Sequence, residues 1–423
     1  MRILLLLAAA VLIAAPAASI AQTPSSLADL HRAAAENDPR VRQLELEARQ
    51  TELRLLNLDA ERRPALRLEG RAQHQSDVPS TPIFTPPRNT IDSSLVVEQR
   101  LLDPAVGPKR TAARAALEET RARIAVSLYG VRSEVNEAYF GALDAEARIT
   151  ALDARMAALE ALHAVAQARV REGAALPGEA RSIEASLLER RRDRASLDSR
   201  RRAALARLSQ ASGVALAPET RLALPALEDA VAGVRPRAAD LRERPEFAQF
   251  DRARDRLSAE AAGIDAIRKP RVSAFGRLGY GRPGVNFIGD RWDAYWLAGV
   301  QLQWTPVTWG TADSDRETLA LEADIVKAEE AAFAARLART AATELADVDR
   351  IEAMLAADAQ VLALREAVER EARIRWDARV IALQEYLDRS GELLDAQLAL
   401  ASHRVELAAA RARLLTTLGM ETK

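Results

Sequence analysis

The sequence lacks cysteine altogether. It can therefore form no disulfide, supply no thiol nucleophile and hold no metal ion through thiolates, and we expect no lipid on an N-terminal cysteine. Aromatic residues are also scarce, at 4% of the chain, which is little for a large globular core. Alanine and leucine dominate instead, as is typical of coiled coils and long helices.

An excess of charge of one sign is missing too. The chain carries 60 basic and 61 acidic side chains, a formal net charge of −1, so it offers no electrostatic case for binding nucleic acid. Histidine is rare, and the four histidines stand far apart without the spacing of metal ligands: they are His31, His74, His163 and His403. We expect neither a metal site nor a cofactor.

Catalytic motifs are missing as well. Neither Gly-x-Ser-x-Gly nor a phosphate-binding P-loop occurs. Residues 279–284 match the dinucleotide fingerprint Gly-x-Gly-x-x-Gly, but Pro283 lies inside the match and no helical pattern follows it. We therefore place Pro283 in the loop of a hairpin and expect that the protein is not an enzyme.

One long apolar run stands at the N-terminus. Residues 3–13 carry no charge, Arg2 precedes them, and Ser19-Ile20-Ala21 forms a small-x-small cleavage site. We expect a signal peptide over residues 1–21 and export of the mature chain. The run is too short to span a membrane as a helix, and no later stretch approaches about 18 uncharged apolar residues, so we expect no transmembrane helix.

The stretch from Pro108 to Glu172 has no internal proline and carries one seam of residues, all apolar but one. The seam residues follow one another at steps of four and three: they are Ile124, Leu128, Val131, Val135, Ala138, Ala142, Ala145, Ile149, Leu152, Met156, Leu159, His163, Ala166 and Val170. A sustained period of 3.5 residues indicates a helix wound against partner helices. At about 1.5 Å per residue this helix is roughly 100 Å long.

The periodicity before this helix is alternating rather than helical. In the run 65–73, Leu66 and Leu68 share one face, whereas Arg67 and Glu69 share the other. A second alternating run follows a loop rich in proline, threonine and serine, and it ends at Asp103-Pro104. We expect a β-hairpin over residues 65–103.

The same order of elements then occurs a second time. Arg62-Arg63-Pro64 recurs as Arg268-Lys269-Pro270, at a distance of 206 residues. We expect two repeats of helix, β-hairpin, long helix and half-length helix: they cover residues 22–213 and 237–423, with a proline-containing linker over 214–236, a second hairpin over 271–305 and a second long helix over 311–377. In each repeat the two shorter helices together match the long helix in length, so we expect them to lie end to end along it.

Each of the four predicted strands has one apolar face. We expect this face to contact lipid through Leu66, Leu68, Leu95, Val97, Val272, Leu278, Tyr280, Trp296, Val300, Leu302 and Trp304. Trp296 and Trp304 lie about 26 Å apart at the rise of a strand, the height of the apolar band of an outer-membrane barrel, whose rims are aromatic. A soluble sheet over a core is the alternative, but the rest of the chain offers only coiled-coil seams as a core.

Four strands cannot close a barrel, and a membrane admits no open sheet edge. Strands from several copies of the chain would therefore have to combine. Two copies give eight strands, whose interior is filled by side chains, whereas three copies give twelve strands and leave room for a lumen.

Several short segments, in their order along the chain, resemble the TolC family of outer-membrane efflux proteins over essentially the whole mature length. The segments are Asn37-Asp38-Pro39, Arg63-Pro64-Ala65-Leu66, Val97-Glu98-Gln99-Arg100-Leu101-Leu102-Asp103, Val300-Gln301-Leu302-Gln303-Trp304, and the stretch from Tyr386-Leu387-Asp388 through Leu393-Leu394-Asp395-Ala396-Gln397 to Leu418-Gly419. The resemblance implies a mostly α-helical fold with a small transmembrane β part: a homotrimeric α-helical barrel topped by a 12-stranded β-barrel.

The resemblance also implies a location and a function. Family members lie in the outer membrane of Gram-negative bacteria and extend into the periplasm. They are exit ducts of tripartite efflux pumps or type I secretion systems, and they passively conduct substrate from an inner-membrane transporter and a periplasmic adaptor (membrane fusion) protein. Many members have glycine at both periplasmic helix turns, whereas this chain has Gly173 at the first turn and Ala378-Arg379 at the second.

The functional residues of such a duct are expected at these turns, where a helical barrel must narrow. The candidates for the tip and its gate are Arg169, Arg171, Glu172, Gly173, Leu176, Glu179, Arg375, Asp377, Arg379, Ile381 and Glu385. Our hypothesis is that some of these charges pair between helices and hold the tips closed, and that Gly173, Leu176 and Ile381 help form the surface facing the adaptor. The alternative is that the charges are solvated, each contributing under about 1 kcal/mol.

A second function stays open at this point. The chain could be a soluble periplasmic coiled-coil scaffold or adaptor, with the hairpins as small protein-binding sheets. The aromatic-rimmed strands and their duplication favour the duct.

Overall fold

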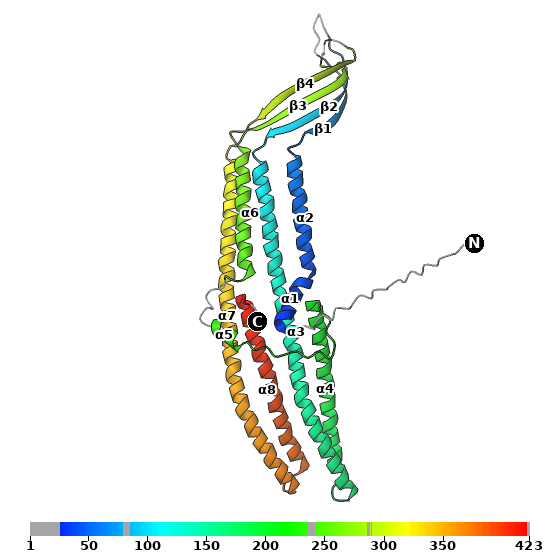
Figure 1. Cartoon of the computed structure of the whole chain (residues 1–423), viewed down its shortest axis with the longest axis vertical. Coiled ribbons are helices and arrows are strands. Elements are labelled where there is room, and N and C mark those ends of the chain that lie inside the picture. Colours follow the sequence, from blue (N-terminus) through cyan, green and yellow to red (C-terminus); the bar gives the residue numbers. More distant parts are fainter. Residues whose placement is uncertain (1–25, 79–84, 235–241, 286–287, 289, 421–423) are drawn as a thin grey trace, which may run out of the picture.

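The structure, a computed structural model, describes residues 26–78, 85–234, 242–285, 288 and 290–420. The predicted signal peptide lies outside these residues. The molecule is an elongated bundle of helices with a sheet at one end (Figure 1). Its elements in chain order are α1 (Leu27–Asn37), α2 (Pro39–Ala60), β1 (Ala65–His74), β2 (Asn89–Leu102), α3 (Val106–Arg171), α4 (Pro177–Ser212), α5 (Glu228–Val234), α6 (Pro245–Ile267), β3 (Arg271–Arg282), β4 (Asp293–Gln303), α7 (Thr311–Asp377) and α8 (Leu383–Leu418).

The order of helices and strands follows the sequence prediction. The first long helix, α3, has 66 residues and begins at Val106, two residues before the predicted Pro108. The second, α7, has 67 residues and covers the predicted range. Every seam residue of α3 is buried or half-buried. The linker contains the short helix α5, which the sequence patterns did not indicate.

Local chemistry fixes the ends of the first two helices. Ser26 caps α1 by accepting a hydrogen bond from the Asp29 amide at 3.2 Å, and Asp38 caps α2 by accepting one from the Arg40 amide at 2.8 Å. Pro39 occupies the first turn of α2, where its missing N–H costs nothing. The chain therefore turns from α1 to α2 at Asp38.

The half-length helices lie end to end along the long ones, as their lengths predicted (Figure 1). At the first junction Asn37 donates a hydrogen bond from Nδ2 to the Ser212 carbonyl at 3.1 Å. Gly213 has a φ of 69° there, and a Cβ on it would lie 2.6 Å from the Cβ of Asn37, so only glycine fits. Gly419 takes the equivalent place in the second repeat, with a φ of 85° against the backbone of Arg244.

The two junctions carry the same ion pair with its charges exchanged. Asp38 pairs with Arg40 at 2.6 Å in the first repeat, and Arg244 pairs with Glu246 in the second. Both pairs lie at equivalent positions, 206 residues apart. Each arginine also donates to a backbone carbonyl, at 2.9 and 3.1 Å respectively. The geometry of the junction is thus kept although the charges are opposite.

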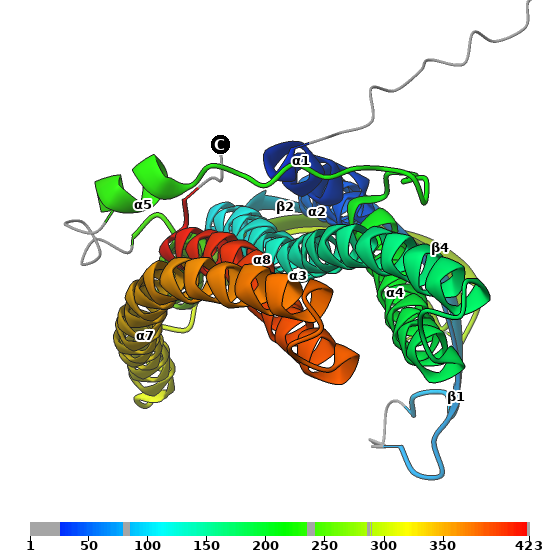
Figure 2. The ribbon, with the colours of Figure 1, turned by 90° about the horizontal axis from the view of Figure 1, so that it is seen from below.

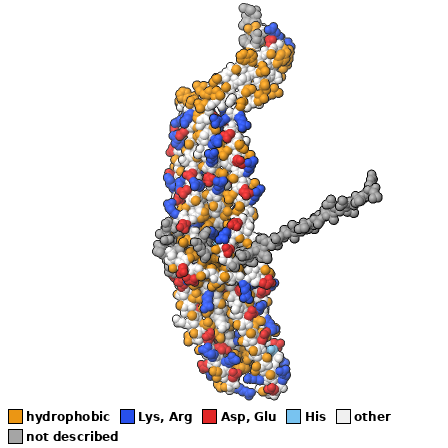
Figure 3. Space-filling view, in the orientation of Figure 1, with side chains coloured by type: hydrophobic (Ala, Val, Ile, Leu, Met, Phe, Trp, Pro, Cys, Tyr) orange, Lys and Arg blue, Asp and Glu red, His pale blue; other side chains and the backbone are white. Residues whose placement is uncertain are grey.

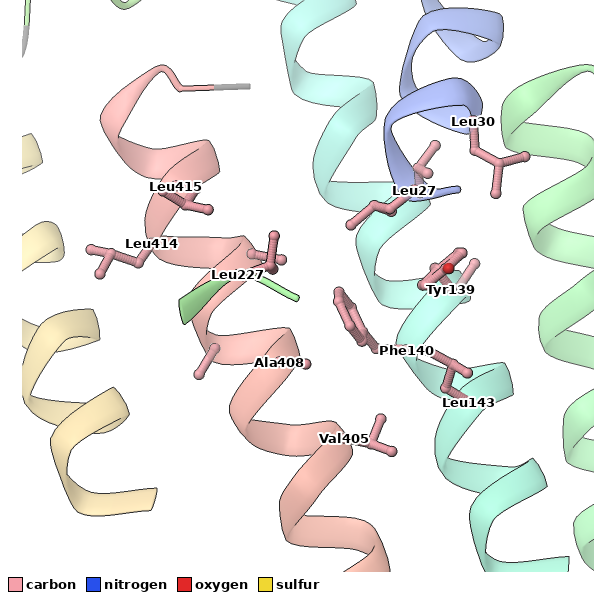
Figure 4. Packing of buried hydrophobic residues seen from close by; sticks show 14 of the residues in the cluster. Leu27, Leu30, Tyr139, Phe140, Leu143, Leu227, Val405, Ala408, Leu414 and Leu415 are labelled. Atoms are coloured by element: carbon pink, nitrogen blue, oxygen red, sulfur yellow. The ribbon is translucent and has the colours of Figure 1, made fainter. Parts of the chain in front are cut away.

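The largest buried apolar cluster lies beside α1 and α5, at mid-height of the bundle (Figure 1), and Figure 4 shows its packing. It includes Leu27 of α1, Tyr139 of α3, Leu227 beside α5 and Leu415 of α8. The Tyr139 hydroxyl donates a hydrogen bond to the Ala223 carbonyl, and burial raises the pKa of this phenol to about 12. Two smaller clusters follow toward the helix turns, so the core runs along the bundle.

The strands form one antiparallel sheet in the order β1-β2-β3-β4. Its central pair, β2 and β3, joins the two repeats. On one face of the sheet two glycines make room for the aromatic side chains paired with them. A Cβ on Gly279 would lie 2.3 Å from the side chain of Tyr295, and one on Gly299 would lie 2.9 Å from the ring of Phe275.

Seen along its length, the bundle is curved (Figure 2). The helices α7, α8, α3 and α4 follow one another along an arc, and α1 and α5 lie on its convex side. Among the described residues, no helix is long and apolar enough to cross a membrane.

Candidate functional site

The residues predicted to face lipid share one face of the sheet. Side chains of directly paired residues point to the same side of an antiparallel sheet, and the register pairs Leu66 with Val97, Leu95 with Leu278 and Leu278 with Trp296. The exposed fraction reaches 80% at Leu68 and 77% at Trp296. All eleven predicted residues are exposed except Val272, which is half-buried.

The opposite face of the sheet is polar. Arg67 pairs with Glu98 across β1 and β2 at 2.6 Å. On the same face the Tyr295 hydroxyl donates to the Asp92 carboxylate at 2.6 Å. The sheet therefore has an apolar side and a charged side, as the alternating sequence predicted.

Both edges of the sheet are open within the chain. β1 and β4 are the outer strands, and each pairs with one neighbour only among the described residues. Their remaining N–H and C=O groups are available to another strand, and a membrane would require that they be paired.

The two helix turns at the opposite end of the molecule have the same backbone structure. In the first turn the Gly173 amide donates to the Val170 carbonyl at 3.0 Å and the Ala174 amide to the Arg169 carbonyl at 2.8 Å. The second turn repeats both bonds 206 residues later, at 2.8 Å each. Gly173 has a φ of 73°, and Arg379, which replaces it in the second turn, has a φ of 59°. The second turn therefore forms without the glycine that this conformation favours.

The predicted tip residues lie together at this end, but few of them contact one another. Among the described residues, no ion pair joins any two of the predicted charges. Arg375 instead pairs with Glu371 of its own helix at 3.8 Å. Ile381 packs against the apolar cluster of the tip. The others are exposed, except Glu179, which is half-buried in the first turn of α4, and Arg169: they are Arg171, Glu172, Gly173, Leu176, Asp377, Arg379 and Glu385.

The contacts that do join the helices of the tip involve residues that the sequence analysis missed. The rings of Trp376 and Tyr386 stack with centroids 5.3 Å apart, and the guanidinium of Arg169 lies 5.4 Å from the Trp376 centroid. The Tyr386 hydroxyl donates to Glu369 at 3.0 Å. The sequence did contain a signal for these contacts: Trp376 and Tyr386 lie close to a helix turn in a chain with few aromatic residues.

A half-buried arginine adds to this group. Burial lowers the pKa of Arg155 on α3, and the nearby Tyr386 and Glu369 act against that shift. Burial likewise raises the pKa of Tyr386. Arg155, Tyr386 and Glu369 come from α3, α8 and α7, so this polar group links the two repeats near the tip.

Comparison with known proteins gives the fold. No protein-family profile matches the chain, and no curated protein matches it by sequence. Solved structures do match. The outer-membrane channel OprN is 19% identical with a TM-score of 0.70, over 93% of this chain and 89% of that one. The chain has the fold of the TolC-type outer-membrane channels.

Two further structures agree. The transmembrane channel CusC is 15% identical with a TM-score of 0.70, over 93% of this chain and 92% of that one. The outer membrane protein VceC from Vibrio cholerae is 14% identical with a TM-score of 0.67, over 94% of this chain and 97% of that one. The similarity therefore covers both the helices and the sheet.

Proposed function

We propose that the protein is a passive exit duct in the outer membrane of a Gram-negative bacterium, with its helices extending into the periplasm. In this proposal it serves a tripartite efflux pump or a type I secretion system. The observation that carries the proposal is the sheet: one face is apolar and exposed, the other is charged, and both edges are open. A lipid-facing wall of a barrel needs these three properties.

The open edges favour assembly from identical copies. Three copies would supply twelve strands, with β4 of one chain paired to β1 of the next. The helical part has unpartnered apolar residues at its two flanks as well: Leu46, Leu53 and Leu56 of α2, and Leu321 and Ile325 of α7, are exposed. α2 and α7 lie at opposite sides of the upper bundle (Figure 1), so a ring of copies would bring these two surfaces together.

The tips are where we propose that the partners dock. They lie at the end of the bundle farthest from the sheet (Figure 1). Leu176, Ile374 and Val380 are exposed there, with exposed fractions of 74%, 69% and 65%. An apolar surface of this kind suits a periplasmic adaptor that connects the duct to an inner-membrane transporter.

The alternative, a soluble periplasmic scaffold, finds less support. It requires a partner or a core that covers the apolar face of the sheet. In the part of the chain that the structure describes, that face is exposed from Leu66 to Trp304.

Membrane fractionation tests the proposal. We expect the protein to stay with the outer membrane through a high-salt wash and to need detergent for release, because an inserted barrel is held by apolar burial rather than by charge. The detergent-released protein should have three times the mass of one chain. Release by salt alone would overturn the duct and favour the scaffold.

A further inference from the structure

Four cations lie at one level of the molecule, where the helices meet the strands. Arg62 and Arg63 follow α2, Lys269 follows α6, and Lys109 lies in the first turn of α3. All four side chains are exposed, and none belongs to an ion pair among the residues that the structure describes. We refer to these four residues as the basic collar.

The carboxylates around the collar are mostly neutralised by other residues. Five of them pair with arginines at this level: the pairs are Asp59–Arg110, Glu61–Arg100, Asp103–Arg271, Asp265–Arg316 and Asp313–Arg268. Asp315 and Glu317 add two exposed negative charges. The basic collar is therefore a local surplus of positive charge on a chain whose formal net charge is −1.

Helix electrostatics explain only part of this arrangement. Cations are favoured at the C-terminal end of a helix, which accounts for the residues that follow α2 and α6. Lys109, however, lies at the N-terminal end of α3, where the helix dipole disfavours a cation. The helix dipole therefore does not account for Lys109.

The apolar band of the sheet borders the collar. Trp304, which directly follows β4, donates from its indole N–H to the Arg268 carbonyl at 2.9 Å, beside Lys269. Basic side chains gather just below the apolar band on the face shown in Figure 3. This face also carries α1 and α5, which Figure 2 places on the convex side of the bundle.

Trp309 marks the same level. It precedes α7, has a φ of 50° and exposes 92% of its surface. A positive φ at a bulky residue destabilises the folded chain by about 1 kcal/mol or more. In the single chain the indole of Trp309 is exposed to water. Tryptophan is enriched where apolar chains of a membrane meet the headgroups.

We propose that the basic collar binds the headgroups of anionic phospholipids in the membrane leaflet next to the helices. Phosphate oxygens accept hydrogen bonds from guanidinium and ammonium groups, and the apolar band above the collar would hold the acyl chains. Both repeats place cations of the collar directly before a proline, Arg62 and Arg63 before Pro64 and Lys269 before Pro270, so the collar would surround an assembled barrel. The inference rests on the proposed membrane position of the sheet.

Tryptophan fluorescence provides the test. Four of the five tryptophans lie between 292 and 309, at the sheet and the collar. The full-length protein would be reconstituted into phosphatidylcholine vesicles that contain a fraction of dibrominated phosphatidylglycerol or, in parallel, of dibrominated phosphatidylcholine. Bromine quenches an indole that the lipid contacts, so the ratio of the two quenching curves gives the relative affinity for the anionic lipid.

We expect the native protein to prefer phosphatidylglycerol about fivefold, the preference that one cation near the headgroups supplies. High salt should reduce the preference. Arg62→Gln, Arg63→Gln, Lys109→Gln and Lys269→Gln together should remove it. The control changes Arg181, Arg200, Arg339 and Arg404 in the same way; these are exposed arginines on α4, α7 and α8, and the preference should remain.

Two other outcomes would distinguish failure of the lipid site from failure of the proposed duct. Equal quenching of the native protein by both brominated lipids would overturn the basic collar as a lipid site while leaving the duct intact. Quenching by neither lipid would mean that the sheet is not in the bilayer, which would overturn the duct together with the inference.

Discussion

Arg379 holds the backbone conformation that glycine holds at the equivalent place of the first repeat. A side chain with Cβ is disfavoured there by about 1 kcal/mol because Cβ crowds the following carbonyl. The turn nevertheless keeps both of its closing hydrogen bonds, so the surrounding helices impose the conformation.

Arg379→Gly should therefore stabilise the second turn by about 1 kcal/mol. Amide hydrogen exchange of the peptide around Val380 would measure it locally, and it should slow about fivefold. Gly173→Ala is the matched reverse change and should speed exchange in the first turn. Equal exchange rates in Arg379→Gly and the native protein would contradict the strain assigned to this residue.

His31 is the most perturbed histidine of the described chain. It is 6% exposed, and its Nε2 lies 2.8 Å from the Asn136 side-chain oxygen. Burial is the main reason why the pKa of His31 is lowered from 6.5 to about 4. Asn136 in turn donates to the Thr416 hydroxyl at 3.0 Å, so the group connects α1, α3 and α8 at mid-height.

This shift predicts a pH dependence of stability. Because the folded-state pKa is below the unfolded one, the unfolded chain binds more protons between pH 4 and 6.5, and stability falls as pH decreases through this window. The loss from His31 should reach about 3 kcal/mol below the folded-state pKa. Thermal unfolding across this range should show a smaller loss in His31→Gln than in the native protein.

His163→Gln is the control for this experiment. The side chains of His163 and Gln167, one turn apart on α3, are within hydrogen-bond distance at 3.3 Å. The pH dependence of His163→Gln should match that of the native protein. A native-like pH dependence in His31→Gln would remove the buried histidine as its source.

Among the elements, β4 offers two neighbouring residues that lie on opposite faces of the sheet. Val300 pairs with Ala274 on the apolar face, and Gln301 pairs with Ser273 on the polar face. The two residues are neighbours in the same strand, so they have nearly the same depth along the sheet. Only the side toward which they point differs.

Val300→Arg should reduce insertion into the outer membrane, because an arginine facing lipid near the bilayer midplane costs about 2–4 kcal/mol. Gln301→Arg, on the other face, should insert like the native protein. The measurement is the amount of each variant in the outer-membrane fraction after a high-salt wash. Equal amounts of the two variants would mean that the apolar face is not the lipid face.

The long helices differ in how deeply they are buried. The whole seam of α3 is covered because α3 packs against α4, α6 and α8. In α7 the apolar residues that recur at the same period include Val348, Ile351, Leu355 and Ala359; they are only partly covered, and Ala359 is exposed. α7 therefore lies at a flank of the chain, which fits the proposed contact with another copy.

At the scale of the whole molecule, the tips decide whether the proposed duct is closed. The predicted charges do not pair with one another within the described chain, so their pairing between helices of different copies stays a prediction. Within one chain the tip is held by Arg169, Trp376, Tyr386 and Glu369 instead.

Neutralising Arg379 and Glu385 together, as Arg379→Gln and Glu385→Gln, should raise the conductance of the reconstituted protein if these charges close the tip. Asp198→Asn with Arg202→Gln is the control, since this exposed pair at 3.0 Å lies within α4 away from the turns. Unchanged conductance in the Arg379 and Glu385 variant would remove both residues as gate residues.

The periodicities of the sequence predicted much of the fold, because each follows from the direction in which side chains point along a helix or a strand. The period of 3.5 residues gave the long helix α3, since a seam must stay on one side of a helix to be buried. The alternation in the strands gave the apolar face from Leu66 to Trp304, since successive side chains point to opposite sides. The sequence did not indicate which residues of the tip contact one another, because residues next to a turn need not touch.

The sequence by itself determined the two repeats, the lengths of their helices and the two faces of their strands, since these follow from spacing along the chain. Only the tertiary structure decided that β2 pairs with β3 across the repeats, that Trp376 stacks on Tyr386, and that Arg379 adopts a positive φ. These features depend on groups brought together from separate elements, and periodicity carries no information about such contacts. The basic collar combines both kinds: three of its four cations precede the equivalent prolines of the two repeats, but the fold sets all four at one level beneath the apolar band.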